Sequence, residues 1–87
     1  MYYVYMIKNN KGRLYVGVTK ELSQRIVYHN NKRGADFTKS GGYESVFIEE
    51  YQTLSETRKR EIQIKKWRRE KKEKLIERFI LGLSTKA

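Results

Sequence analysis

The chain contains no cysteine and no proline, and long hydrophobic runs are also missing. The lack of cysteine excludes a disulfide scaffold, a cysteine-ligated zinc ion and a thiol nucleophile. No apolar stretch approaches the ~20 residues that a membrane-spanning helix needs. The first residues are rich in tyrosine and lack a charged leader followed by an apolar segment, so we expect no signal peptide. These features favour a cytoplasmic protein that does not enter a membrane.

Acidic residues are scarce relative to basic ones. The 87 residues include 20 Lys and Arg against 10 Asp and Glu, which gives a formal net charge of +10. An excess of this size in a short chain favours a polyanionic partner, in most cases nucleic acid, and a membrane surface is the main alternative.

The length and composition predict one small domain. A chain of this length buries only ~60–65% of the surface that it exposes when unfolded. Hydrophobic residues make up 38% of the sequence, which is enough for a single thin core. We expect this domain to span residues 1–83 and residues 84–87 to form a flexible tail.

Three segments have the composition of β-strands, namely Tyr2–Lys8, Arg13–Thr19 and Ser45–Tyr51. The first two are separated by a turn that ends at Gly12, so they should form a hairpin. A three-residue loop with Gly12 in the left-handed region would place Tyr5 and Tyr15 on one face of the sheet. A four-residue loop would place them on opposite faces, because strand side chains alternate with a period of two.

Three segments have the periodicity of helices. The first would run from about Lys20 to Asn31 with Thr19 as its N-cap. Thr53-Leu54-Ser55-Glu56 fits a capping box and opens a second helix through about Arg69. A third helical stretch covers Lys71–Leu83. No proline or glycine separates the last two, so the pattern allows either one bent helix or two.

Basic residues gather in two regions that can contact nucleic acid. The polar connection between residues 30 and 42 contains Lys32, Arg33 and Lys39. Residues 57–78 hold eleven Lys and Arg against four Glu, and most of these cations lack an acidic partner within the helix. The candidates for nucleic-acid contacts in this second region are Arg58, Lys65, Arg68 and Arg69. The alternative interpretation of the basic run in residues 57–78 is a helix face that contacts only solvent.

Glu61 is the single acid between Thr57 and Arg69. A carboxylate there can hold one Mg²⁺ or Mn²⁺, with waters and a substrate phosphate completing the coordination. The alternative is an ordinary helix salt bridge to Lys65, four residues further on.

Four other side chains can take part in phosphodiester chemistry. Arg25 can hold a phosphate in a bidentate contact, and His29, on the same predicted helix face, can assist proton transfer. Tyr5 and Tyr15 can take part in proton transfer if a nearby cation or metal favours the ionised phenol. Each also has a plain structural interpretation, namely a surface arginine, a structural histidine and good strand residues. Trp67 is either a core residue or a platform for a stacked base.

Taken together, these residues resemble the GIY-YIG nuclease family. Tyr3-Val4-Tyr5 stands in place of the first motif, and Tyr15-Val16-Gly17 matches the second. Arg25 and His29 follow at the expected spacing, and Glu61 matches the family's helix-borne acid. The resemblance extends from Tyr2 to about Ile76, and is greatest to the small stand-alone bacterial members.

The resemblance implies an α+β fold, with a three-stranded antiparallel sheet flanked by helices. It also implies a single divalent metal on Glu61, a tyrosine general base and an arginine that stabilises the phosphate. By this correspondence Tyr15 is the first choice for the base and Tyr5 for a supporting hydroxyl, while His29 takes the place of a polar partner. The implied activity is a structure-tolerant endonuclease that hydrolyses DNA phosphodiester bonds, in repair or recombination.

The sequence also departs from the family pattern. Tyr3 replaces the first glycine, and no asparagine follows Asn31, whereas many members have one near the end of the domain. This second departure leaves open a module that keeps the fold and binds nucleic acid without catalysis. We expect no attached targeting domain, so that substrate selection would come either from this module or from a protein partner.

Overall fold

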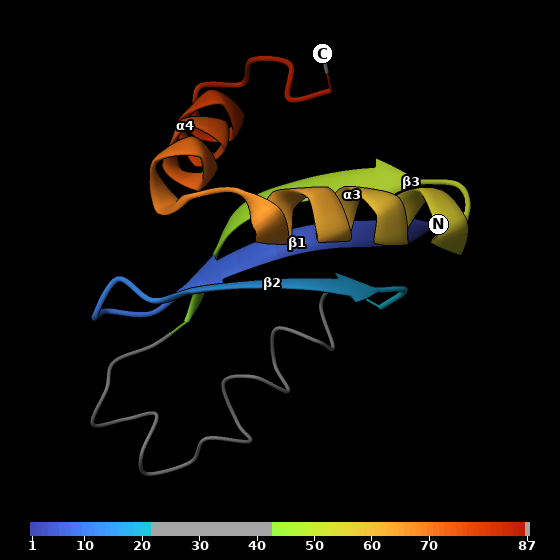
Figure 1. Ribbon diagram of the computed structural model, residues 1–87, viewed down its shortest axis with the longest axis horizontal. Helices are drawn as coiled ribbons and strands as arrows, with labels where there is room; N and C mark the ends of the chain where they lie inside the picture. The colour runs from blue at the N-terminus through green and yellow to red at the C-terminus, as the bar shows by residue number, and fades with distance from the viewer. Residues whose placement is uncertain (22–42, 87) are drawn as a thin grey trace, which may run out of the picture.

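Three antiparallel strands and two helices form the part of the chain that the computed structural model describes, residues 1–21 and 43–86. The strands are β1 (Tyr2–Lys8), β2 (Leu14–Thr19) and β3 (Glu44–Tyr51), and the sheet order is β2-β1-β3. The helices are α3 (Leu54–Lys66) and α4 (Arg69–Ile80), which lie on the same side of the sheet (Figure 1). The predicted α+β fold with an antiparallel sheet is confirmed.

The β1–β2 hairpin has the register that the short loop predicts. Tyr5 pairs with Gly17, and Ile7 pairs with Tyr15. The Asn9 N–H donates to the carbonyl of Arg13 at 3.1 Å, so three residues remain in the loop, and Gly12 ends it with a φ of 81°. The Asn9 side-chain oxygen also accepts hydrogen bonds from the N–H groups of Lys11 and Arg13. Tyr5 and Tyr15 therefore lie on one face of the sheet.

Strand β3 carries a one-residue bulge that changes which side chains face the helices. Met6 pairs with Phe47, but Ile7 pairs with Ser45, so Val46 is the extra residue. The bulge allows the consecutive residues Val46 and Phe47 to join the same core. Alternation alone would have sent them to opposite faces.

The two faces of the sheet carry separate apolar clusters. The face toward the helices buries Val4 and Met6 of β1 with Phe47, and Ile64 of α3 and Leu75 and Ile76 of α4 complete this core. The ring of Phe79 meets the ring of Phe47 edge to face at 5.7 Å. The opposite face carries a second cluster of Tyr5, Ile7 and Tyr43, with Tyr15 and Ile48 packed against it.

Helix α3 begins at the predicted capping box. The Thr53 hydroxyl accepts a hydrogen bond from the Glu56 N–H at 3.2 Å and donates to the Glu56 carboxylate at 2.9 Å. The expected end near Arg69 is wrong, because Trp67 and Arg68 are extended and separate two helices. The break lets α3 cross all three strands while α4 packs on β3.

Helix α4 ends earlier than the expected Leu83. Its last residue is Ile80, and Gly82 follows in the left-handed region with a φ of 75°. The Leu83 N–H donates to the Arg78 carbonyl and the Gly82 N–H to the Phe79 carbonyl, which is the Schellman pattern. Glycine has no Cβ to oppose this conformation, so Gly82 stops the helix.

A buried ion pair joins β3 to α3. The Glu49 side chain is 2% exposed and that of Arg60 is 15% exposed, with 2.9 Å between Oε1 and Nε. Arg60 also donates to the carbonyl of Thr85, and the Tyr51 hydroxyl donates to Glu49 at 2.8 Å. The expected flexibility of residues 84–87 stays a prediction, although Arg60 and Arg78 bond the backbone of Thr85 and Ser84.

Alkaline pH is expected to weaken the fold through Tyr51. Burial, together with the hydrogen bond to Glu49, raises the pKa of Tyr51 to about 12 from its ordinary value of 10.0. Below pH 10 the Tyr51 phenol is neutral in the folded and in the unfolded chain, so its contribution to folding stability is fully present there. Between pH 10 and 12 the unfolded chain ionises first, and stability falls as the pH rises through the folded value. Urea unfolding midpoints measured across this window should fall less steeply for Tyr51→Phe than for the natural chain. Equal slopes for the two proteins would contradict the assignment.

Within residues 1–21 and 43–86, neither helix combines the length and the hydrophobicity needed to cross a lipid bilayer. Of the helix predicted from about Lys20 to Asn31, Lys20 and Glu21 are described and are not helical, and residues 22–31 lie outside the described residues. Its proposed N-cap, Thr19, is described, and its hydroxyl accepts a hydrogen bond from the Glu21 N–H at 3.1 Å.

Candidate active site

One cavity brings together residues of the sheet edge and of helix α3. It has a volume of about 260 Å³. Strand β2 is an edge strand of the described sheet, and the cavity lies against it. The lining residues come from β1, β2 and α3, and they are Tyr5, Tyr15, Val16, Gly17, Val18, Arg58, Glu61 and Lys65.

Gly17 sets how closely Tyr5 approaches β2. A Cβ atom at position 17 would lie 2.5 Å from the Tyr5 hydroxyl oxygen and 2.6 Å from Cζ. Real Cβ atoms do not tolerate such distances, so the phenol ring lies directly over the glycine. Among the described glycines, those with positive φ are Gly12 and Gly82, so position 17 requires space and not an unusual backbone conformation. The missing side chain lets the Tyr5 hydroxyl reach the cavity.

Tyr15 enters the cavity from the edge strand itself. Its ring meets that of Tyr43 edge to face, with 5.4 Å between centroids and an angle of 77°. This contact limits the orientations that the Tyr15 ring can adopt, although the side chain is only partly buried. Because Tyr5 and Tyr15 share one face of the sheet, both hydroxyl-bearing rings line the same cavity.

Glu61 reaches the cavity from α3. Its side chain is 13% exposed, so it does not point into bulk solvent. Its Oε2 atom lies 3.2 Å from Nζ of Lys65, four residues along the helix. The helix salt bridge of the structural interpretation is present, and the carboxylate also lines a cavity with two phenols. The role of Glu61 as a metal ligand stays a prediction.

The surroundings of Glu61 are cationic. Arg58 and Lys65 lie three residues before and four residues after it, so all three share one helix face. Both cations line the cavity. A phosphate that entered would meet two positive side chains, and water would still reach it because Arg58 and Lys65 are exposed.

The oxygen donors of the cavity suit a hard divalent cation. A carboxylate and phenolic hydroxyls match the preference of Mg²⁺ and Mn²⁺ for oxygen ligands. Throughout the described part of the chain, no three His, Cys, Asp or Glu side chains gather as a candidate metal cluster. A metal here would therefore have Glu61 as its carboxylate ligand, and water and substrate oxygens would supply the remaining ligands.

Five of the predicted site residues lie outside the described residues. Arg25 and His29 belong to the segment between residues 22 and 42, and so do the predicted nucleic-acid contacts Lys32, Arg33 and Lys39. Their roles remain predictions.

Two further predicted nucleic-acid contacts lie away from this cavity. Arg68 lines a separate groove between the two helices. Arg69 bonds the Glu73 carboxylate at 2.9 Å and the carbonyl of Gly12, and so ties α4 to the hairpin. Lys8 also contacts Glu73, at 3.3 Å. Burial acts to raise the pKa of Glu73, but the hydrogen bonds from Arg69 and Lys8 outweigh it and lower that pKa below its ordinary value.

Sequence reasoning missed the contributions of Val16 and Val18 to the cavity wall. They flank Gly17, and their position within the second tyrosine motif was the available signal. Sequence reasoning also did not single out Arg60, because this residue lies within a run of basic residues that is equally consistent with a solvated helix face. The acid that pairs with Arg60, Glu49, lies eleven residues away on β3, so no helix spacing could have indicated the pair.

Comparison with known proteins confirms the family resemblance of the sequence. The family model described as the GIY-YIG catalytic domain matches residues 1–74. A UPF0213 protein of Staphylococcus epidermidis is 43% identical over 77 residues, which cover 87% of this chain and 94% of that protein. A UPF0213 protein of Staphylococcus aureus is 41% identical over 76 residues, covering 86% and 93%.

A solved structure shares the fold. The solution NMR structure of a UPF0213 protein from Bacillus halodurans aligns with a TM-score of 0.59 and 30% sequence identity. The alignment covers 88% of this chain and 84% of that one.

Proposed function

The chain belongs to the GIY-YIG catalytic domain family, and from that premise we propose that it is an endonuclease that hydrolyses DNA phosphodiester bonds. The observation that supports the proposal best is the shared cavity of Tyr5, Tyr15 and Glu61. These groups come from three separate elements, and a surface that served only to bind polyanions would not need a nearly buried carboxylate among them.

The proposed chemistry assigns a role to each described side chain. Arg58 and Lys65 bind the phosphate that is to be cut, as charge-assisted hydrogen-bond donors. Tyr15, ionised under the influence of a neighbouring cation or metal, accepts the proton of the attacking water and becomes a neutral phenol. The Tyr5 hydroxyl, held over Gly17, orients that water. Arg25 stabilises the charge that develops on the phosphate, and His29 acts as a polar partner of the site. The roles of these last two rest on the family correspondence alone.

Glu61 would hold one Mg²⁺ or Mn²⁺, which would polarise the phosphate and stabilise negative charge on the leaving oxygen. Lys65 competes for the same carboxylate. Since Lys65 is a flexible and exposed side chain, it can exchange the carboxylate for a substrate phosphate when the site is filled.

DNA cleavage with variants at Glu61 tests this proposal. Purified protein is incubated with single-stranded, duplex and branched DNA, with Mg²⁺ or Mn²⁺ and with a chelator. We expect cutting that requires the metal, and a loss of about 10²–10⁴-fold in rate for Tyr15→Phe, the range for a general base. Glu61→Gln should lose cutting to a similar extent.

The matched control is Glu77→Gln, which removes one exposed carboxylate from α4 with the same change in net charge. It should cut at the natural rate. Metal-dependent cutting that survives Glu61→Ala would remove this site from the mechanism, and an absence of cutting on every substrate would reject the nuclease itself.

A nucleic-acid-binding module without catalysis is the second candidate function. Two observations favour it, namely the ion pair that occupies Glu61 and the lack of any asparagine after Asn31. This alternative predicts binding that weakens with salt, by about 0.9 units of log–log slope per duplex phosphate contacted. It also predicts that Glu61→Gln leaves that slope unchanged.

The proposal extends to the partners and the setting of the protein. We propose DNA as the substrate. We also propose that the protein acts in repair or recombination and that it is located in the cytoplasm. The substrate is selected either by the domain itself or by a protein partner that directs the domain to it.

A further inference from the structure

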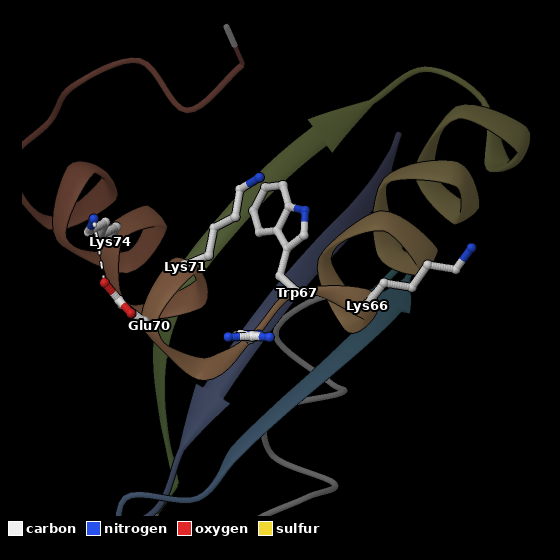
Figure 2. Close-up of a pocket in the computed structure, with 6 residues that line it drawn as sticks. Lys66, Trp67, Glu70, Lys71 and Lys74 are labelled. Carbon is white, nitrogen blue, oxygen red and sulfur yellow. Dashed lines mark ion pairs between the residues drawn. The ribbon is translucent and has the colours of Figure 1, made fainter.

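A second groove lies where α3 passes into α4, and it combines an aromatic ring with unpaired cations. Its volume is about 520 Å³, within the range of sites for small ligands. The lining residues are Lys66, Trp67, Arg68, Glu70, Lys71 and Lys74. Figure 2 shows the indole of Trp67 between the two helices, with the Lys71 side chain running alongside it.

The charges of this groove are not balanced by the protein. Lys74 pairs with Glu70 at 3.8 Å, and both side chains are more than 70% exposed. Among the described residues, Lys66, Arg68 and Lys71 have no carboxylate partner. Three cations beside one aromatic ring, with no acid to neutralise them, favour an anionic ligand.

The Trp67 ring contacts one cation that other bonds hold in place and a second cation on an exposed side chain. Trp67 packs against the main core, and the Arg60 guanidinium lies 5.3 Å from the ring centroid. Arg60 is held in place by Glu49 and the Thr85 carbonyl. The Lys71 ammonium lies 4.3 Å from the centroid on an exposed side chain, so it can leave the ring for a phosphate.

The start of α4 adds positive potential to the same groove. Arg68 occupies the N-cap position of this twelve-residue helix, and among the described residues no side chain caps it. The Lys71 N–H donates to the Arg68 carbonyl, so the N–H groups of Arg69 and Glu70 and the helix dipole are what favour an anion at this end. The Glu70 carboxylate of the same turn opposes this effect but is paired with Lys74.

We propose that this groove binds one unpaired nucleotide of single-stranded DNA, with its base on Trp67 and its phosphate on Lys71 and Arg68. A base inside a duplex is stacked on both sides and cannot offer a flat face to the indole, whereas an unpaired base can. The inference rests on the proposed function in one respect, because it names the feature of the DNA substrate that the enzyme selects.

The position of the groove fits a substrate that also fills the catalytic cavity. Lys65 lines the cavity and its neighbour Lys66 lines the groove. Along the axis of α3, Lys66 lies about 7.5 Å beyond Glu61 and is turned by about 140° around the helix, so the two sites open on different sides of α3. A junction between duplex and single strand that bends around the end of α3 would place a phosphate at Glu61 and an unpaired base at Trp67.

Fluorescence of Trp67 tests the inference without any need for cutting. Trp67 is the sole tryptophan of the 87 residues, so its emission reports on this groove alone. The full chain is titrated, in the presence of a chelator, with a short oligothymidylate and with a blunt duplex that carries the same number of phosphates. We expect the oligothymidylate to quench the emission and the duplex to leave it nearly unchanged.

Charge variants test the phosphate contacts. Lys71→Gln and Arg68→Gln should each lower the salt slope of oligothymidylate binding by about 0.7. Lys59→Gln is the matched control, since it removes an exposed α3 lysine outside both lined sites and should not change the slope. Trp67→Phe should keep the affinity within about threefold, while Trp67→Leu should lose at least about fivefold.

Three results would overturn the inference. They are equal quenching by duplex and single strand, no quenching by either, and a loss of slope in Lys59→Gln as large as that in Lys71→Gln. If Trp67→Leu fails to fold, the quenching and the charge variants still decide the question. Quenching by a protein that cuts no DNA would support nucleotide binding in the groove and reject the endonuclease activity. Cutting without quenching would support the endonuclease activity and reject nucleotide binding in the groove.

Discussion

Gly17→Ala is expected to lower DNA cutting at least about a hundredfold and to destabilise the fold by about 1–3 kcal/mol. The added Cβ would lie 2.5 Å from the Tyr5 hydroxyl and 2.9 Å from Cε1, so the ring has to move. Tyr5 is 2% exposed and packed in the second cluster, which leaves little room for that movement. The hydroxyl would leave the cavity, although Tyr15 and Glu61 remain.

A double variant separates the steric effect from a general weakness of β2. In the background Tyr5→Leu, the shorter side chain no longer reaches position 17. Gly17→Ala should then have little further effect on the urea midpoint, so the two changes should be strongly non-additive. A Gly17→Ala protein that cut DNA at the natural rate would show that the Tyr5 hydroxyl does not take part in the reaction.

Glu49→Ala is expected to destabilise the protein by about 3–5 kcal/mol, the usual effect of removing one partner of a buried ion pair. The change leaves the Arg60 guanidinium, only 15% exposed, without its carboxylate. It also removes the acceptor of the Tyr51 hydroxyl. Since small domains have a total stability of about 5–15 kcal/mol, urea unfolding should show a large shift.

Two companion variants identify the origin of that loss. Glu50→Ala removes an exposed acid one residue along β3 and should change the stability by less than about 0.5 kcal/mol. Replacing the pair together, as Glu49→Leu with Arg60→Met, should restore much of the lost stability, because no buried charge is left alone. Equal losses for Glu49→Ala and the double variant would mean that the pair itself is not the cause.

The catalytic proposal and the ion-pair network involve different faces of α3. Glu61 and Lys65 face the cavity at β2, while Arg60 faces Glu49 on β3. A single short helix therefore positions the proposed metal ligand and anchors itself to the sheet at the same time. The separation of the two sites allows stability and cutting to be tested independently.

Local sequence was sufficient wherever neighbouring residues control the backbone. Gly12 fixed the hairpin loop, and the hairpin fixed the shared face of Tyr5 and Tyr15, as the register shows. Thr53 and Glu56 fixed the start of α3. Gly82 carried an equally local signal for the end of α4, which the helical periodicity up to Leu83 obscured.

Other features depended on contacts between distant segments. The break at Trp67 and Arg68 has no proline or glycine, and it is set by α3 crossing the sheet while α4 turns to pack on β3. The bulge at Val46 allows two consecutive apolar side chains, Val46 and Phe47, to be buried in the same core, and this packing depends on the distant helices.

The sequence by itself determined the three strands, the start of α3, the basic character and the set of residues that resembles a nuclease site. Tertiary structure decided that Tyr5, Tyr15 and Glu61 share a cavity, and that Arg60 is buried with Glu49 while Lys71 covers an aromatic groove. The physical reason is range. Turn and capping chemistry acts over three or four residues, whereas the environment of a charge is set by whichever distant strand or helix packs against it.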